Sequence, residues 1–121
     1  MDSILIAGAS GFLGRNLVPI LLKKKFKLII FSTGNSTFKI SRIKEYRKKI
    51  IFVNSKNLLI TIHKHRIVMF INLQVSFSYF HNLKSLSEMI DANITTPIKI
   101  AEMCSEKKYF KRLISPSSYF L

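Results

Sequence analysis

Residues 3–14 decide the fold of this chain, and they read Ser3-Ile4-Leu5-Ile6-Ala7-Gly8-Ala9-Ser10-Gly11-Phe12-Leu13-Gly14. The first five of them form a short apolar run that ends at a glycine, which predicts a buried strand. From Gly11 onward apolar residues recur with a helical period, and Lys23-Lys24-Lys25 follow where the helix dipole favours cations. Three of the four glycines of the chain therefore stand between a predicted strand and a predicted helix.

Glycines in this position are typical of a dinucleotide-binding turn. Gly8 would allow a tight exit from the strand, Gly11 would let the backbone approach a pyrophosphate, and Gly14 would let the helix pack close to the sheet. The start of the helix offers free N–H groups and a partial positive charge to phosphates, and Ser10 adds a hydroxyl. The alternative is that all three are simple turn glycines.

Strand-like and helix-like segments alternate along the rest of the chain. Apolar runs predict strands at residues 27–31, 50–53, 67–73 and 112–115, with a weak helix within 38–49, a short helix or turn within 55–64 and a long helix over 83–107. Apolar runs without polar alternation are typical of strands covered on both faces. The sequence predicts one α/β domain over residues 1–121, a Rossmann-like doubly wound parallel sheet of about five strands in the order 3-2-1-4-5.

The apolar periods also predict which helix residues face the core, and Pro19 should kink the first helix or loosen one turn of it. The single cysteine, Cys104, lies on such a face, and we interpret it as a small core residue rather than a nucleophile. The predicted inward residues are Phe12, Leu13, Leu17, Val18, Leu21 and Leu22, then Leu58, Leu59 and Ile62, then Leu86, Met89, Ile90, Ile94, Ile98, Ala101 and Cys104.

The composition excludes several classes of protein. Hydrophobic residues make up 48% of the 121 residues, which is enough for a core and unlike a disordered chain. The start of the chain lacks the basic region of a leader, and the longest apolar run, residues 67–80, is too short and too interrupted to span a bilayer. We therefore expect a cytoplasmic protein with no membrane partner.

The net charge of +14, from 20 Lys and Arg against 6 Asp and Glu, is the unusual feature. Such a charge can attract nucleic acid. However, Lys outnumbers Arg, and the basic clusters are spread along the chain between the apolar runs. The sequence therefore favours a solvated basic surface over a specific nucleic-acid site.

Residues 8–17, Gly8-Ala9-Ser10-Gly11-Phe12-Leu13-Gly14-Arg15-Asn16-Leu17, resemble the G-x-x-G-F-x-G segment of the extended short-chain dehydrogenases/reductases, the NAD-dependent epimerase/dehydratase family. Three later segments resemble motifs of that family in the right order. They are the fourth strand, residues 67–73, the Asn-Thr helix motif, residues 91–97, and the fifth strand with its Ser pair, residues 113–118. The resemblance spans the chain and implies NAD or NADP as cofactor and nucleotide sugars as substrates of the full-length parent.

The resemblance also implies roles for individual residues. Asn93 matches the structural and active-site Asn of the family. Ser118, or alternatively Ser117, would supply the hydroxyl that hydrogen-bonds the reacting substrate oxygen. The expected cofactor-binding residues are Gly8, Ser10, Gly11, Phe12, Leu13, Gly14, Arg15, Ser32, Asn54, Leu73 and Asn93.

Three positions depart from the family's cofactor pattern. Ser32 stands where an acidic residue usually binds the adenosine ribose of NAD. With Arg15 and lysines near it, this favours the 2′-phosphate of NADP. Asn54 stands where the family often has an Asp that contacts adenine, and it could still hydrogen-bond the adenine amino group. Gln74 replaces a small residue and could crowd the cofactor.

The Tyr-x-x-x-Lys pair that serves the family as general acid/base is absent from the 121 residues. We therefore expect the cofactor-binding part of an epimerase/dehydratase-type oxidoreductase without its catalytic and sugar-binding part, inactive alone. The fifth strand would have an open edge, which predicts self-association or a complementing C-terminal chain. The alternatives are a non-catalytic NAD(P)-binding or interaction module and, less favoured, a basic nucleic-acid-binding protein.

Overall fold

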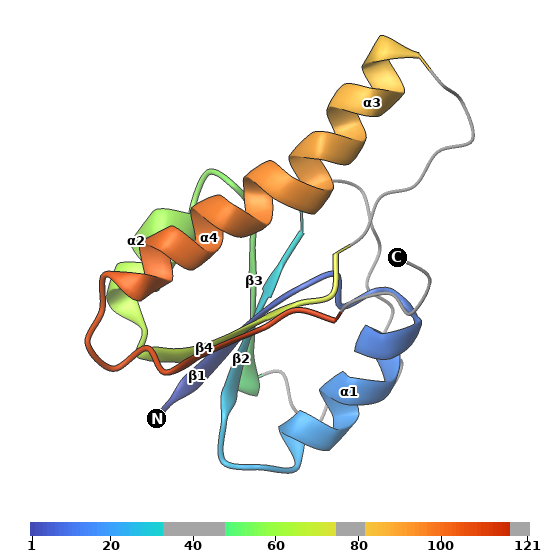
Figure 1. Cartoon of the computed structure of the whole chain (residues 1–121). Coiled ribbons are helices and arrows are strands. Elements are labelled where there is room, and N and C mark those ends of the chain that lie inside the picture. The colour runs from blue at the N-terminus through green and yellow to red at the C-terminus, as the bar shows by residue number, and fades with distance from the viewer. Residues whose placement is uncertain (33–47, 75–81, 117–121) are drawn as a thin grey trace.

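A computed structural model describes residues 1–32, 48–74 and 82–116 (Figure 1). Its strands are β1 (Ser3–Ala7), β2 (Lys27–Phe31), β3 (Ile50–Val53), β4 (Ile67–Asn72) and β5 (Arg112–Ile114). They form one parallel sheet in the order β3-β2-β1-β4-β5. The predicted fold and strand order are therefore confirmed, with β4 and β5 each one residue shorter than the apolar run.

The sheet is covered on both faces, which explains why its strands read as continuous apolar runs. Leu5 lies between Ile29 of β2 and Phe70 of β4, and none of the three side chains is exposed. These residues belong to one core cluster, which includes Ile62, Ile100 and Cys104 of the helices on that side. Neighbouring strand residues such as Ile4, Ile6 and Ile30 face the other way and pack with Val18 and Leu22.

Among the described residues, three helices supply these covers. Helix α1 (Phe12–Leu22) lies on one side of the sheet, and α2 (Leu58–Lys64) and α4 (Thr96–Ser105) lie on the other (Figure 1). Helix α3 (Leu83–Ile90) continues through the π-helical segment η2 (Asp91–Thr95) into α4. The predicted long helix is thus present but contains a π-helical interruption. The weak helix predicted within 38–49 lies almost wholly outside the described residues.

Several predicted inward residues face solvent instead. Phe12 and Leu13 at the start of α1 are 73% and 54% exposed, and Leu59 of α2 is 50% exposed. Gly14, Val18 and Leu22 form the buried face of α1, and they place its first turn above the end of the sheet, where Phe12 and Leu13 have no cover among the described residues. The predictions for these three side chains were therefore wrong.

The face predicted for the long helix is also wrong in part. Cys104 is buried, as expected, together with Ile100, which the period had not selected. Leu86, Ile90, Ile94 and Ile98 are exposed instead. A π turn holds more residues than an α turn, so it rotates the face of α4 relative to that of α3. A regular period drawn through both helices therefore mixes two faces.

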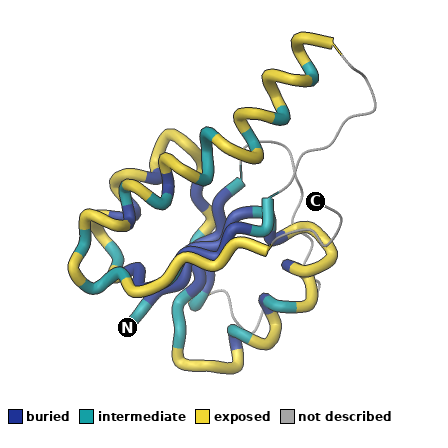
Figure 2. Tube along the Cα trace, in the orientation of Figure 1, coloured by how far each residue is buried: buried dark blue, intermediate teal, exposed yellow. Residues whose placement is uncertain are grey.

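β5 forms the far edge of the sheet and is exposed along its length (Figure 2). Leu113 and Ile114 are 49% and 39% exposed, whereas the core strand β1 is buried throughout. Among the described residues, this edge has no further strand to pair with.

Candidate cofactor site at the carboxyl edge of the sheet

All five strands are parallel, so their carboxyl ends meet at one edge of the sheet. The connection after β1 and the one after β4 leave in opposite directions along the sheet, because β1 is followed by β2 on one side and β4 by β5 on the other. Ligands of doubly wound sheets bind at such a switch point. The residues that follow the strands at this edge are Gly8, Ser32, Asn54, Leu73 and Ser115.

Gly8 makes the turn out of β1 with a φ of +80°, a conformation that favours glycine. A Cβ at Gly8 would lie 2.6 Å from the Leu73 carbonyl oxygen. The Leu73 N–H donates to the Ala7 carbonyl at 2.8 Å, so the exits of β1 and β4 are hydrogen-bonded to each other. Both the φ angle and the close approach require glycine at this position.

Gly14 and Gly11 differ in whether the surrounding structure requires a glycine. Gly14 is buried, and a Cβ there would lie 2.5 Å from the Ala9 Cα, so only glycine lets α1 pack this closely on the turn. Gly11 has a φ of −77° and is exposed, and a Cβ there would lie 3.6 Å from the Gly8 carbonyl oxygen, an ordinary contact. Neither backbone conformation nor packing within the described chain explains the glycine at position 11.

The start of α1 lies open at this edge. Gly11 is the N-cap, with no side-chain cap on the helix and no acidic residue in its first turn. Ser10, Phe12, Leu13 and Arg15 surround it and are all exposed. An uncapped helix start of this kind presents backbone N–H groups and the positive end of the helix dipole to solvent.

Ser32 and Asn54 follow the two strands beyond β1. The Ser32 N–H donates to the Val53 carbonyl at 3.0 Å, which places the two residues on adjacent strand ends. The Asn54 Oδ1 accepts from the Lys56 N–H at 2.9 Å and from the Asn57 N–H at 3.3 Å. Because this oxygen is engaged within its own turn, the expected bond from the adenine amino group to it is not favoured.

A hollow of about 330 Å³ lies at the same edge, between η2 and α4 on one side and the ends of β4 and β5 on the other. Its polar residues are Asn72, Asn93 and Ser115, from three segments distant in the sequence. Asn72 is only 9% exposed, and its Oδ1 accepts from the Gln74 N–H at 3.3 Å. The remaining lining residues are Ile94, Pro97, Ile98, Ala101 and Leu113.

The hollow brings the predicted Asn93 together with two residues that had not been selected, Asn72 and Ser115. The signal for Asn72 was present, since it is an amide at the end of an otherwise apolar strand. Ser115 had no such signal, because Ser117 and Ser118 follow it closely. Ser118 lies outside the described residues, so its expected role stays a prediction.

Other kinds of site are not found in the part of the chain that the structure describes. It contains no group of three or more His, Cys, Asp or Glu residues that could hold a metal ion. Burial raises the pKa of the Cys104 thiol to about 12, which removes it as a nucleophile near neutral pH. No described helix has the length and apolar character needed to cross a membrane.

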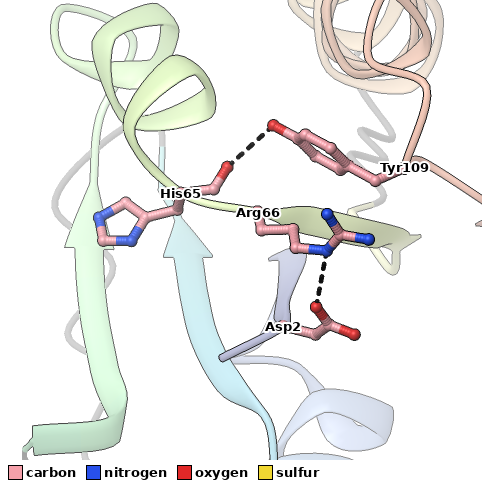
Figure 3. A network of polar contacts seen from close by, with 4 residues as sticks. All are labelled: Asp2, His65, Arg66 and Tyr109. Atoms are coloured by element: carbon pink, nitrogen blue, oxygen red, sulfur yellow. Dashed lines mark hydrogen bonds and ion pairs between the residues drawn. The ribbon is translucent and has the colours of Figure 1, made fainter.

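The amino edge of the sheet, where the strands begin, holds a small polar network (Figure 3). Arg66 donates from Nε to Asp2 Oδ1 at 3.0 Å, and its guanidinium lies 4.9 Å from the centre of the Tyr109 ring. The Tyr109 hydroxyl donates to the His65 carbonyl oxygen at 3.3 Å. These contacts join the starts of β1 and β4 to the turn between α4 and β5.

Comparison with known proteins agrees with this geometry. The family model described as "NAD dependent epimerase/dehydratase family" matches residues 4–120. The search of curated proteins returned no match.

Solved structures with the same fold include three that illustrate its range. dTDP-glucose 4,6-dehydratase from Bacillus anthracis, in complex with NAD, has a TM-score of 0.74 at 19% identity and aligns with 98% of this chain and 38% of its own. UDP-glucose 4-epimerase from Thermotoga maritima, with UDP-glucose, has a TM-score of 0.74 at 18% identity over 96% of this chain and 38% of its own. A short-chain dehydrogenase/reductase from Serratia marcescens has a TM-score of 0.78 at 12% identity over 98% of this chain and 56% of its own.

The chain therefore spans from 38% to 56% of the length of these three proteins. At these identities the structural likeness shows the fold, while the family model covers nearly the whole sequence. With the glycine turn, the parallel sheet and the hollow at its carboxyl edge in place, this match shows that the chain belongs to the NAD-dependent epimerase/dehydratase family.

Proposed function

We propose that this chain is the dinucleotide-binding part of an epimerase/dehydratase-type oxidoreductase and that it binds NAD or NADP at the carboxyl edge of its sheet. Gly8, Ser10, Gly11, Phe12, Leu13, Gly14 and Arg15 form the proposed pyrophosphate turn, with Ser32, Asn54, Leu73 and Asn93 along the edge. The bound cofactor would supply hydride transfer, while these residues hold and orient it.

The observation that supports this most is the contrast among the three glycines. Gly8 and Gly14 are required by the fold itself, as their Cβ contacts show. Gly11 has a backbone conformation that any residue adopts and open space beside it. A ligand that approaches the backbone at Gly11, beside an uncapped helix start, explains the third glycine, and a pyrophosphate has the charge that this helix start favours.

The hollow beside the turn is the proposed place for the reacting part of the cofactor and its substrate. Asn72, Asn93 and Ser115 offer amide and hydroxyl groups there, among apolar side chains. Neighbours of the same fold are solved with NAD and with UDP-glucose, and we propose a nucleotide sugar as the substrate class of the full-length parent. Ser118 is the proposed hydroxyl donor to the reacting oxygen.

The finer choice between the two cofactors depends on the end of β2. Ser32 offers a hydroxyl where a carboxylate would bind the two ribose hydroxyls of NAD. Arg15 and Lys56 bring positive charge to this edge, whereas Lys23, Lys24 and Lys25 lie at the far end of α1 and no longer support the argument. We therefore propose NADP as the preferred cofactor.

We further propose that the chain does not turn over substrate alone, because its 121 residues contain no Tyr-x-x-x-Lys. Residues 1–121 would form the cofactor domain, and a further segment or a complementing chain would have to supply the proton donor and the sugar site. The proposed compartment is the cytoplasm, which suits a lone thiol.

Cofactor binding is tested by calorimetric titration and by thermal shift with NAD and NADP separately. The wild-type chain should bind NADP more tightly than NAD, and saturation should raise its melting temperature. Gly11→Ala should weaken binding of both by at least about tenfold, because a methyl group displaces the pyrophosphate from the backbone.

The folded state supplies the control. Gly11→Ala fits the φ of −77° and should leave the melting temperature of the free chain unchanged or slightly raised. Tighter binding of NAD would contradict the NADP preference alone. Absence of binding by a cooperatively folded wild-type chain, or unchanged binding by Gly11→Ala, would contradict the proposed site.

A further inference from the structure

The amino edge of the sheet carries a dense row of positive charge. The segments that lead into β2, β3, β4 and β5 bring twelve Lys and Arg residues to this edge, against Asp2 and Glu106. Figure 1 shows the turns before β2, β4 and β5 on the side of the molecule where the chain begins. Nine of the twelve side chains are exposed, so their charge faces solvent; they are Lys23, Lys24, Lys25, Lys48, Lys64, Arg66, Lys108, Lys111 and Arg112.

The helix ends at this edge account for only a small part of that charge. Helices α1, α2 and α4 all end here, and each C-terminus carries about half a negative charge that favours a nearby cation. Lys49 does serve such an end, since its Nζ donates to the Leu22 carbonyl at 3.2 Å. With the three helix ends and both acidic residues counted, the positive charge still exceeds the negative by roughly eight. A surface that repels itself in this way gains free energy when a polyanion neutralises it.

The length of the row fits an extended polyanion rather than a single anion. Five strands lie side by side at this edge, and at about 4.8 Å between neighbours the row spans roughly 19 Å. A nucleic-acid duplex carries one negative charge for about every 1.7 Å of its axis, which gives roughly eleven phosphates over the same length. About half of them would face the protein, so five or six phosphates meet nine exposed cations.

The uncharged side chains of the edge distinguish among polyanions. Residues 23–27, 48–49, 63–66 and 106–112 include no large hydrophobic side chain that is mostly exposed, so these turns lack the apolar anchors of a membrane-surface segment. Phe26 and Phe110 pack against the two core clusters, and the Arg66 guanidinium lies 4.9 Å from the centre of the Tyr109 ring. None of these three rings is open for the base stacking by which single strands are held. The edge therefore suits a duplex, whose bases are already stacked on one another.

We propose that the amino edge of the sheet binds the phosphate backbone of a nucleic-acid duplex without sequence preference. Ten of the twelve basic residues are lysines, which meet phosphates as point charges rather than through a planar fork. The charge is presented by turns and helix ends, not by a helix laid across the edge to enter a groove. The candidate cofactor site lies at the carboxyl edge, so this binding is independent of NAD(P).

Fluorescence anisotropy with a labelled 20-base-pair DNA duplex of mixed sequence measures the binding. The folded wild-type chain should bind with a micromolar Kd at 50 mM NaCl. The logarithm of its affinity should fall against the logarithm of salt concentration with a slope of about −5, because five or six phosphates release their counterions. A duplex of unrelated sequence should bind within about twofold.

Charge reversal locates the binding on the amino edge. Lys24→Glu combined with Lys108→Glu should weaken duplex binding at least about tenfold and reduce the salt slope by about two, one for each lost phosphate contact. The matched control is Lys56→Glu combined with Lys84→Glu, which changes the net charge equally at exposed positions away from this edge. It should stay within about threefold of wild type. Both variants are first shown to melt cooperatively, and the edge variant should be no less stable than wild type because it loses like-charge repulsion.

Competitors separate the duplex from other partners. A single strand of the same length, and vesicles of phosphatidylcholine with 30% phosphatidylserine, should bind more weakly per anionic group than the duplex. NADP at matched ionic strength should leave duplex binding unchanged. A chain that binds the duplex but not NADP would support the amino edge and contradict the proposed function alone.

Four results would overturn the proposal. They are no duplex binding by the folded wild-type chain at 100 µM and 50 mM NaCl, equal losses in the two double variants, tighter binding of the single strand or the vesicles, and displacement of the duplex by NADP. Equal losses would mean that only net charge matters, and displacement would place the duplex at the carboxyl edge.

Discussion

Gly14 shows how directly one residue can determine the fold of the glycine turn. A Cβ there would lie 2.5 Å from Ala9 Cα, and the contact is with backbone, which cannot move aside as a flexible side chain would. We predict that Gly14→Ala lowers the free energy of unfolding by about 1–3 kcal/mol. Denaturant unfolding measures this, with Gly11→Ala as the matched control that should stay close to wild type. Equal stability of the two variants would contradict the assigned packing.

His65, at the amino edge of the sheet, makes the stability of the fold depend on pH. Burial lowers the pKa of His65 from its usual value of 6.5, and the positive charges of Lys27 and Lys64 lower it further. The unfolded chain therefore binds a proton more readily than the folded one as the pH falls through 6.5. We predict that stability is full above this pH and declines below it, and that His65→Gln reduces the decline. Identical pH profiles for wild type and variant, followed by thermal melting, would rule this out.

The residues of the candidate site could be predicted from the sequence only where their reason is local. The glycine turn has a local reason, since its spacing, the strand before it and the helix after it are all adjacent. Asn72 and Ser115 reach the hollow through the parallel pairing of β4 with β5, which no local pattern reveals. The Asn54 oxygen is engaged by its own turn, a detail that depends on the rotamer rather than on the residue type.

At the scale of the elements, the strands were predictable and the helix faces were not. A strand buried on both sides shows its full length as an apolar run, and the first three strands have the predicted bounds. An amphipathic helix shows that an apolar face exists but not which element covers it. In α3 and α4, two apolar lines share one helix, and the π turn of η2 breaks the regular period that would separate them.

Helix α4 allows this assignment of faces to be tested. Ile100 is 1% exposed and packs in the core cluster with Phe70 and Cys104. We predict that Ile100→Ala costs about 2–5 kcal/mol of unfolding free energy, from lost burial and the cavity left behind. Ile20→Ala, at a side chain of α1 that is 57% exposed, should change it by less than about 0.5 kcal/mol. Similar losses at the two positions, measured by denaturant unfolding, would show that the buried face of α4 is misassigned.

At the scale of the whole molecule, the parallel sheet gathers charge that the sequence spreads out. Each strand after the first is preceded by a basic cluster, and parallel strands all begin at the same edge. Because the clusters are spread along the sequence, they suggested a dispersed basic surface. The structure instead places most of its described positive charge at the amino edge of the sheet, where the strands begin, opposite the candidate site. The residues are Lys23, Lys24, Lys25, Lys27, Lys48, Lys49, Lys64, Arg66, Lys107, Lys108, Lys111 and Arg112, with Asp2 and Glu106 as the acidic residues described beside them.

Such crowding of like charge should make the stability of the molecule rise with salt. Burial first, and then the positive charges of Lys27 and Lys64, lower the pKa of His65 at this edge. Raising the ionic strength from 20 to 300 mM shortens the Debye length to below about 8 Å and screens these exposed charges. We predict a higher melting temperature at 300 mM NaCl, by about 4–8 °C for each kcal/mol of repulsion removed.

The location of the repulsion is tested by charge reversal. Lys24→Glu combined with Lys108→Glu should raise the melting temperature at 20 mM salt and reduce the further gain at 300 mM. Lys56→Glu, at the carboxyl edge, is the matched control. It should raise the melting temperature at 20 mM salt less, and should reduce the further gain at 300 mM less. The melts are compared at one low protein concentration, so that any self-association does not add a salt dependence of its own. A melting temperature that falls with salt, or a larger effect at Lys56, would show that the basic edge does not limit stability.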